Sequence, residues 1–132
     1  MIDIHRREAL RTLEEDLGYI FEKPELLDLA LCHKSFANET GVGNTDNERL
    51  EFLGDSVLGL AVAKLLYDLV PPMNEGDMSR VRAYMVKEET LAQVARSLDI
   101  GCHLHLGKGE EQSGGAEKPS ILADAFEALV GA

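Results

Sequence analysis

The chain has 132 residues, and its formal net charge is −11 at pH 7 because 24 acidic residues face 13 basic ones. This length supports one compact domain with a single core and no more. The acidic balance argues against strong binding of nucleic acid by the domain alone, although divalent ions bound by clustered carboxylates would invert the local field.

Helical periodicity dominates the first half of the chain. An amphipathic helix is expected to end at Gly18, and a proline opens a short helix over residues 24–31. Residues 33–47 are polar and contain glycine, so they predict a long loop. A long helix should follow over about residues 46–70, where two prolines stop it.

The second half is also helical by pattern. Residues 74–100 predict helix with a break near residues 86–87, and Gly101 is expected to end it. Residues 107–119 are polar and glycine-rich and predict a flexible connection. A phosphate cradle is the alternative there, but no strand precedes the glycines. Pro119 opens the last helix, and because strand signals are almost absent we expect an all-α helical bundle.

Two strongly apolar segments carry carboxylates at helical spacing. Glu48, Glu51 and Asp55 fall on one face of the long helix, and Asp124 and Glu127 lie one turn apart on the last helix. No lysine or arginine lies three or four residues from either set. Because the segment after Asp55 is apolar almost all round, we expect a helix buried over most of its surface and carboxylates that are only half solvated.

Desolvated carboxylates must be protonated, paired or bound to metal, and hard oxygen ligands suit Mg²⁺ or Mn²⁺. One isolated pair would be read as an ordinary solvated face, but two sets in nearly chargeless segments favour metal. If the two helices pack together, their four or five carboxylates would hold one or two divalent ions. Such sites activate water for phosphodiester hydrolysis, although oxygen-rich sites also have structural roles.

The stretch ERLEFLGDSVLGL resembles the signature of the ribonuclease III family, and ALCHKSFANE, NEGDMSRVRAYMV and SILADAFEALVGA are similar to its flanking motifs in the same order. The resemblance covers nearly the whole chain. It implies an all-α catalytic domain that cleaves double-stranded RNA as a homodimer, using Mg²⁺ with Mn²⁺ as a substitute. It also implies 5′-phosphate and 3′-hydroxyl ends with short 3′ overhangs, in the processing of rRNA and mRNA.

The resemblance also implies roles for individual residues. The four metal-binding carboxylates would be Glu51, Asp55, Asp124 and Glu127, with Asp55 and Glu127 as catalytic groups. Accessory acidic positions near the cleavage valley would be Glu48 and Glu75, and Phe52 would reach into the partner subunit. Composition and spacing alone select neither Glu75 nor Phe52.

Candidate RNA contacts are less specific. The resemblance places the segment His33, Lys34 and Ser35 near the RNA, and Arg80 and Arg82 are candidates for phosphate contacts, as are Lys108 and Lys118. Any of these basic residues could equally be a solvated surface group. His33, His103 and His105 lack accompanying ligands at metal-site spacing, so core or surface histidines are expected.

Bacterial members of this family usually carry a C-terminal double-stranded-RNA-binding domain, and nothing in residues 1–132 corresponds to one. We therefore expect residues 1–132 to be a C-terminally truncated catalytic domain. A non-catalytic RNA-binding or scaffold member of the same fold is the rival hypothesis. Loss of a carboxylate would favour it, but all four are present.

The N-terminal segment is charged and amphipathic and lacks the apolar run of a secretion signal, so a cytoplasmic protein is expected. Cys32 and Cys102 are the only cysteines, and their spacing matches no zinc site. In a reducing compartment both thiols should be free, and neither a membrane nor a small-molecule cofactor is expected as a partner.

Overall fold

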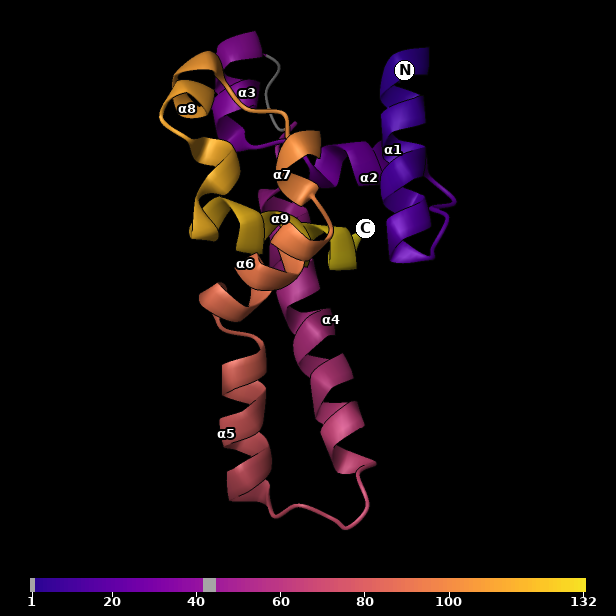
Figure 1. The fold of residues 1–132 in the computed structure, drawn as a ribbon, viewed down its shortest axis with the longest axis vertical. Coiled ribbons are helices and arrows are strands. Elements are labelled where there is room, and N and C mark those ends of the chain that lie inside the picture. Colours follow the sequence, from indigo (N-terminus) through magenta and orange to yellow (C-terminus); the bar gives the residue numbers. More distant parts are fainter. Residues whose placement is uncertain (1, 42–44) are drawn as a thin grey trace.

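The structure is a computed structural model that describes residues 2–41 and 45–132. Within these ranges nine α-helices and one short 3₁₀-helix follow one another (Figure 1). No strand occurs in the described ranges, where a single isolated bridge pairs Cys32 with His105. The all-α prediction is therefore confirmed. A search of the same residues finds no helix long and apolar enough to span a membrane.

The elements in chain order are α1 (Ile4–Leu17), α2 (Pro24–Ala30), α3 (Lys34–Thr40), α4 (Glu48–Tyr67), α5 (Glu75–Met85), α6 (Glu88–Ser97), α7 (Ile100–His103), α8 (Lys108–Gln112), η1 (Gly115–Glu117) and α9 (Pro119–Gly131).

Local signals set most of the helix ends. Asp3 caps α1 by accepting a backbone hydrogen bond of 2.9 Å, and Gly18 ends the helix in the left-handed region at φ 67°. Prolines begin α2 and α9 as predicted. The predicted break near residues 86–87 is confirmed, because α5 ends at Met85 and α6 begins at Glu88.

The prediction of a long loop over residues 33–47 is wrong for Lys34–Thr40, which form α3, and residues 42–44 lie outside the described residues. His33 caps this helix by accepting the Ser35 N–H at 3.2 Å, and Gly41 ends it at φ 71°. The Phe36 ring stacks on His105, with 4.9 Å between ring centroids. A helix this short is unstable alone, so its caps and this distant contact hold it.

The prediction of a flexible connection over residues 107–119 is also wrong, because α8 and η1 occupy it. The Gly107 N–H donates to Ser35 Oγ at 2.9 Å, and the Lys108 N–H donates to a Glu39 carboxylate oxygen at 2.7 Å. Lys118 Nζ lies 3.2 Å from both carboxylate oxygens of Glu110. These contacts join α8 to α3 and to the start of α9.

The prediction that Gly101 ends the preceding helix is wrong, because this residue lies inside α7. A Cβ atom at this position would lie 2.5 Å from the backbone oxygen of Ala116. The glycine therefore permits a close approach between α7 and η1, a role that the linear sequence does not separate from a helix stop.

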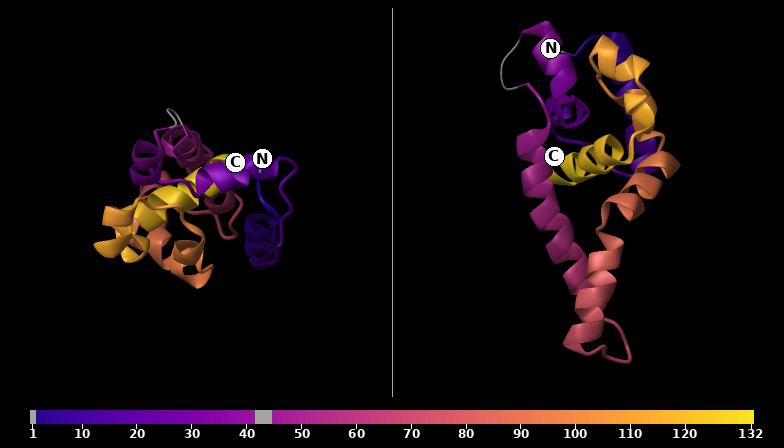
Figure 2. Two further views of the ribbon diagram at one scale, coloured as in Figure 1. Left: turned by 90° about the horizontal axis from the view of Figure 1, so that it is seen from above. Right: turned by 90° about the vertical axis from the view of Figure 1, so that its left-hand side faces the viewer.

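The core lies around α9, which packs against α4 and α6 and occupies the middle of the molecule in both views of Figure 2. The largest fully buried side chains come from four helices, with Leu31 at the end of α2: Leu10, Leu13, Leu27, Leu31, Ile100 and Leu122. All six belong to one hydrophobic cluster that combines residues of α1, α2, α7 and α9. This core fixes the C-terminal helix, on which two of the predicted site residues lie.

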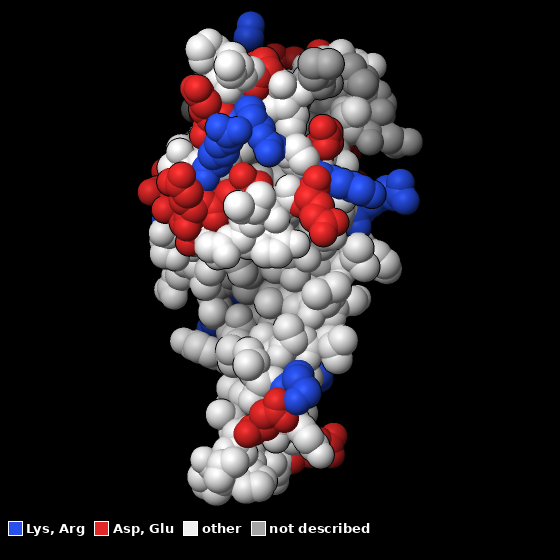
Figure 3. Space-filling model, turned by 90° about the vertical axis from the view of Figure 1, so that its right-hand side faces the viewer, with Lys and Arg blue, Asp and Glu red and all other residues white. Residues whose placement is uncertain are grey.

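The C-terminal half of α4 is not buried over most of its surface, contrary to the prediction. Together α4 and α5 form an arm that extends away from the other helices (Figure 1). Leu60, Leu65 and Tyr67 on this arm are 73%, 64% and 75% exposed. In Figure 3 charged side chains gather over the upper part, and a largely uncharged surface continues down the arm. An apolar pattern predicts burial, but it does not say that the covering surface belongs to the same chain.

Candidate functional site

The crossing of α4 and α9 brings their backbones into direct contact. A Cβ atom on Gly54 would lie 1.6 Å from the backbone oxygen of Glu127, and one on Gly131 would lie 2.3 Å from that of Leu50. Only glycine tolerates such an approach. The crossing therefore sets the side chains that flank Gly54 beside those of α9.

Three carboxylates meet at this crossing. Oxygen atoms of Glu51 from α4 and of Asp124 and Glu127 from α9 lie within 4.8 Å of one another. No other group of three or more potential ligand residues comes together in the part of the chain that the structure describes. We call these three residues the carboxylate trio.

Glu127 is the most buried member of the trio, with 9% of its surface exposed. Burial, a hydrogen bond with Asp55 and the negative charge of Asp55 raise the pKa of Glu127 from an ordinary value of 4.5 to about 8. Near neutral pH Glu127 therefore keeps its proton in the metal-free protein. Asp55 is exposed and lies outside the trio, but this hydrogen bond places it at the trio's edge.

The other two members are also difficult to ionise. Burial raises the pKa of Asp124, and the nearby charge of Glu88 adds to the effect. Burial raises the pKa of Glu51 as well, with contributions from Asp124 and Asp55. A cation placed among the three would reverse each of these shifts.

Glu48, the remaining carboxylate of the α4 face, does not belong to the trio but lines a cavity together with Asp124. It is exposed and lies 4.0 Å from Lys34 Nζ, with both side chains more than half exposed. Such a pair contributes little to stability. The absence of basic residues at helical spacing along α4 and α9 thus holds, but Lys34 from α3 approaches through the fold.

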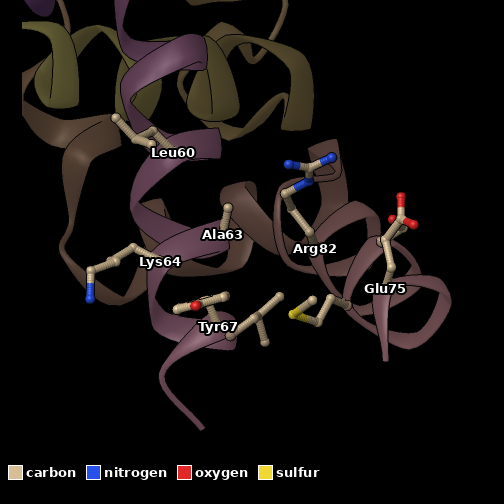
Figure 4. A pocket seen from close by; sticks show the side chains of 9 residues that line it. Leu60, Ala63, Lys64, Tyr67, Glu75 and Arg82 are labelled. Carbon is tan, nitrogen blue, oxygen red and sulfur yellow. The ribbon is translucent and has the colours of Figure 1, made fainter. Parts of the chain in front are cut away.

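Neither Glu75 nor Phe52 belongs to the carboxylate trio. Glu75 begins α5 and lines a pocket of about 400 Å³ between α4 and α5 (Figure 4). Arg82 lines the same pocket, whereas Arg80 forms an ion pair with Asp77. Phe52 follows Glu51 on α4 and is 78% exposed.

A second cavity, of about 310 Å³, adjoins the trio through Asp124. Its lining includes the predicted contact residues His33 and Lys34, and it also includes Glu110 and Lys118. Sequence reasoning missed Glu110, because its pairing with Lys118 depends on the unpredicted helix α8. Ser35 does not line this cavity but holds the His33 ring through Nδ1.

The other histidines and the cysteines have no place in the site. His105 Nε2 lies 3.1 Å from Asp28, which also bonds Arg6 at 2.6 Å, and His103 is buried. Cys32 and Cys102 are both free, as predicted. Core and surface histidines were the expected interpretation.

Fold and site together define an all-α domain built around an acidic centre at a helix crossing, a class that binds divalent cations. Comparisons with known proteins are more specific. The profile of the ribonuclease-III-like family matches residues 23–132. Ribonuclease 3 of Cupriavidus taiwanensis is 53% identical over 123 residues, which are 93% of this chain and 46% of the relative. That of Pelotomaculum thermopropionicum is 52% identical over 127 residues, 96% of this chain and 53% of the relative.

Solved structures agree with the sequence matches. The nuclease domain of ribonuclease III from Campylobacter jejuni superposes with a TM-score of 0.83 at 46% identity, covering 91% of this chain and 80% of that one. A second structure of that domain gives a TM-score of 0.82 at 44% identity, with 99% and 82% covered. The first is described by its flexibility in a region involved in dimer formation.

The chain belongs to the ribonuclease-III-like family, which confirms the resemblance seen in its motifs. It spans about half the length of the curated relatives that it matches.

Proposed function

We propose that this domain is a metal-dependent endonuclease that hydrolyses phosphodiester bonds in double-stranded RNA. The observation that supports the proposal most directly is the carboxylate trio, whose oxygen atoms lie within 4.8 Å of one another in a member of the ribonuclease-III-like family. Duplex recognition would rest on A-form shape and on backbone contacts more than on base sequence.

The trio fits a hard divalent cation. Burial and nearby negative charges raise the pKa of all three carboxylates, and a cation placed among them would stabilise their ionised forms. Glu51, Asp124 and Glu127 would hold Mg²⁺, or Mn²⁺ in its place, with Asp55 contributing directly or through water. When bound, such an ion would supply Lewis-acid chemistry that lowers the pKa of a coordinated water, and a second ion would stabilise the departing 3′ oxygen.

The protein's own groups then have distinct tasks. Glu127, whose pKa is raised to about 8, must release its proton before it can act as an anionic ligand beside Asp55. The close crossing at Gly54 keeps Glu51 and Glu127 at fixed separation, so the charge on the trio is preorganised for the reaction. Lys34 and the arginines of α5 are candidates for holding the phosphate backbone.

The arm supports a homodimer as the working unit. Phe52 is 78% exposed, and the pocket between α4 and α5 is lined by Leu60, Tyr67 and Met78 among others (Figure 4). An exposed aromatic ring and an open apolar pocket on one chain are complementary. A second copy that fills the pocket with its own Phe52 would cover the uncharged surface seen in Figure 3.

Two-fold symmetry fits the positions of ring and pocket. In a closed dimer each contact occurs twice, so two contacting positions on antiparallel α4 helices lie equally far from the axis. Val57 lies five positions after Phe52 and six before Ala63, which lines the pocket. An axis near Val57, itself 41% exposed, therefore places the ring opposite the pocket.

Within one chain Glu75 does not belong to the carboxylate trio, but in this dimer it would lie near the trio of the partner. Glu75 lines the pocket that would receive the partner's Phe52, and Phe52 is the direct neighbour of Glu51. Glu75 would then lie near the partner's carboxylate trio, as an accessory acidic group. Two such sites cutting opposite strands would leave 5′-phosphate and 3′-hydroxyl ends with short 3′ overhangs, in the processing of rRNA and mRNA in the cytoplasm.

A gel assay tests this function directly. Uniformly labelled duplex RNA should be cut by the chain with Mg²⁺ and left intact with EDTA, while single-stranded RNA and duplex DNA persist. The alternative is a non-catalytic RNA-binding or scaffold member of the fold. Binding of duplex RNA without cleavage at any Mg²⁺ or Mn²⁺ concentration would establish that alternative.

A further inference from the structure

The His33 ring is held through one edge. Its Nδ1 lies 2.7 Å from Ser35 Oγ and accepts the Ser35 N–H at 3.2 Å. Ser35 Oγ in turn accepts the Gly107 N–H at 2.9 Å, so its own hydrogen is available for Nδ1. Because the Ser35 N–H can only donate, Nδ1 must be the unprotonated nitrogen, and the neutral ring carries its hydrogen on Nε2.

His33 also lines the cavity of about 310 Å³ beside Asp124, and because Ser35 engages Nδ1, Nε2 is the ring nitrogen left for the cavity. In the part of the chain that the structure describes, His33 Nε2 has no hydrogen-bond partner. Burial lowers the pKa of His33, against the opposing charges of Glu110 and Asp124, which agrees with a neutral ring. The cavity thus receives one neutral N–H donor whose direction is fixed by α3 and α8.

The remaining lining of the cavity is mixed in charge. Lys118 bonds both carboxylate oxygens of Glu110 at 3.2 Å, and Lys34 lies 4.0 Å from Glu48. Both lysines are thus close to carboxylates, and Asp124 adds a third acid. A phosphate bound in this cavity would be repelled by the three acids, and both lysines there are already close to a carboxylate. A neutral group that both donates and accepts fits better, and on an RNA strand that group is the ribose 2′-hydroxyl.

We propose that this cavity binds one 2′-hydroxyl of the RNA near the scissile phosphate, with His33 Nε2–H donating to the hydroxyl oxygen and a carboxylate of the cavity accepting its hydrogen. The inference rests on the proposed function and adds the feature by which the site distinguishes RNA from DNA at a single nucleotide. A deoxynucleotide there would leave the ring donor and the carboxylate unpaired in a site closed by substrate.

The test combines one protein change with single-atom changes in the substrate. His33→Ser keeps an oxygen that can cap α3 and removes the ring donor. Duplexes with one 2′-deoxynucleotide, moved position by position past the cleavage site, are compared by Kd and by kcat/KM with Mg²⁺. For the unmodified chain one position should lower kcat/KM by more than about 10-fold, because two hydrogen bonds are lost there. His33→Ser should lower kcat/KM by about 3- to 10-fold on all-RNA duplex, the effect of one neutral hydrogen bond, and should show a smaller further loss at that position.

Controls separate this contact from other effects. His5→Ala changes an exposed histidine on α1 and should keep the full positional penalty. His33→Asn retains a capping oxygen and a shorter N–H donor, so it replaces His33→Ser if that variant does not fold, and it should show a reduced penalty. Independently of RNA, ¹⁵N NMR of the free protein should show an unprotonated Nδ1 and a protonated Nε2 on His33.

Each contrary result has a distinct meaning. If His33→Ser keeps the full penalty at every 2′-deoxy position, the 2′-hydroxyl contact is wrong while the nuclease function stands. If the variant instead loses sensitivity to one uncharged methylphosphonate linkage, the cavity binds a phosphate, which also overturns the inference. If the unmodified chain neither binds nor cleaves all-RNA duplex with Mg²⁺, the proposed function fails together with it. A proton on Nδ1 would remove the donor from the cavity.

Discussion

Among the site's carboxyl groups, Glu127 has the most strongly raised pKa. It is 9% exposed, it lies within 4.8 Å of two other acids, and it shares a hydrogen bond with Asp55. Helical spacing was enough to predict that Asp124 and Glu127 share a face, because the 3.6-residue period is a local property. The contact between Asp55 and Glu127 could not be predicted from spacing, since it depends on how closely two distant helices cross.

The metal-free domain should lose stability as pH rises. The pKa of Glu127 is raised from 4.5 to about 8 on folding, so the folded state binds a proton more tightly than the unfolded chain does. The resulting stabilisation is fully present below about pH 4.5 and is lost as pH rises towards about 8. Urea unfolding in EDTA across this range should show the decline, and Glu127→Gln should flatten it. An equal slope in both proteins would mean that Glu127 does not carry the shift.

Glu127→Gln should also separate cleavage from binding. It should lower cleavage by about 10³-fold, because a few kcal/mol of transition-state stabilisation by the bound ion is lost. Affinity for duplex RNA should change little, since backbone contacts lie elsewhere. Thermal melts should show a smaller rise with excess Mg²⁺ than the unmodified chain shows. A variant that keeps the full Mg²⁺-induced rise would identify Glu127 as a structural acid and not a ligand.

At the scale of helices, the crossing of α4 and α9 is what makes two acidic faces one site. The ends of the long, strongly periodic helices were predicted to within a few residues, because caps, prolines and apolar spacing are signals within the local sequence. The short helices α3 and α8 were missed, because their stability comes from contacts between them, such as Gly107 N–H to Ser35 Oγ. The role of Gly54 was missed for the same reason.

Two glycines of α4 should therefore respond in opposite ways to alanine. Gly54→Ala places a Cβ atom 1.6 Å from the Glu127 backbone oxygen, so α4 and α9 must separate, at a cost of about 2–3 kcal/mol or more. Gly59→Ala meets no heavy atom within 4 Å and should stabilise α4 by about 0.5–1 kcal/mol. Urea midpoints measure both, and Gly54→Ala should also weaken Mg²⁺ binding. Equal effects of the two changes would contradict the close crossing.

The whole molecule consists of a compact core and an arm whose apolar side chains are largely exposed. Sequence reasoning treated the apolar half of α4 as core, because a core and an interface share one apolar pattern. Exposure of Leu60, Leu65 and Tyr67 at 64–75% corrects this interpretation. The same exposure would give the proposed homodimer a physical cause, since this uncharged surface would leave water when a second copy covers it.

The proposed dimer contact predicts complementation between two variants that are each defective. Phe52→Ala removes the ring and keeps the pocket, whereas Ala63→Trp keeps the ring and fills the pocket (Figure 4). Each homodimer then lacks both ring-in-pocket contacts and should be weaker by about 2–4 kcal/mol or more. A mixed dimer retains one contact, with the Phe52 ring of the Ala63→Trp chain in the open pocket of the other.

Sedimentation of the two variants, alone and mixed in equal amounts, measures this directly. Each alone should be mainly monomeric at concentrations where the unmodified chain dimerises, and the mixture should contain more dimer than either. Tyr19→Ala, which removes another exposed aromatic ring outside the arm, should leave dimerisation unchanged. Since a mixed dimer regains stability only if ring and pocket meet across the two chains, a mixture as monomeric as its components would place Phe52 or the pocket outside the interface.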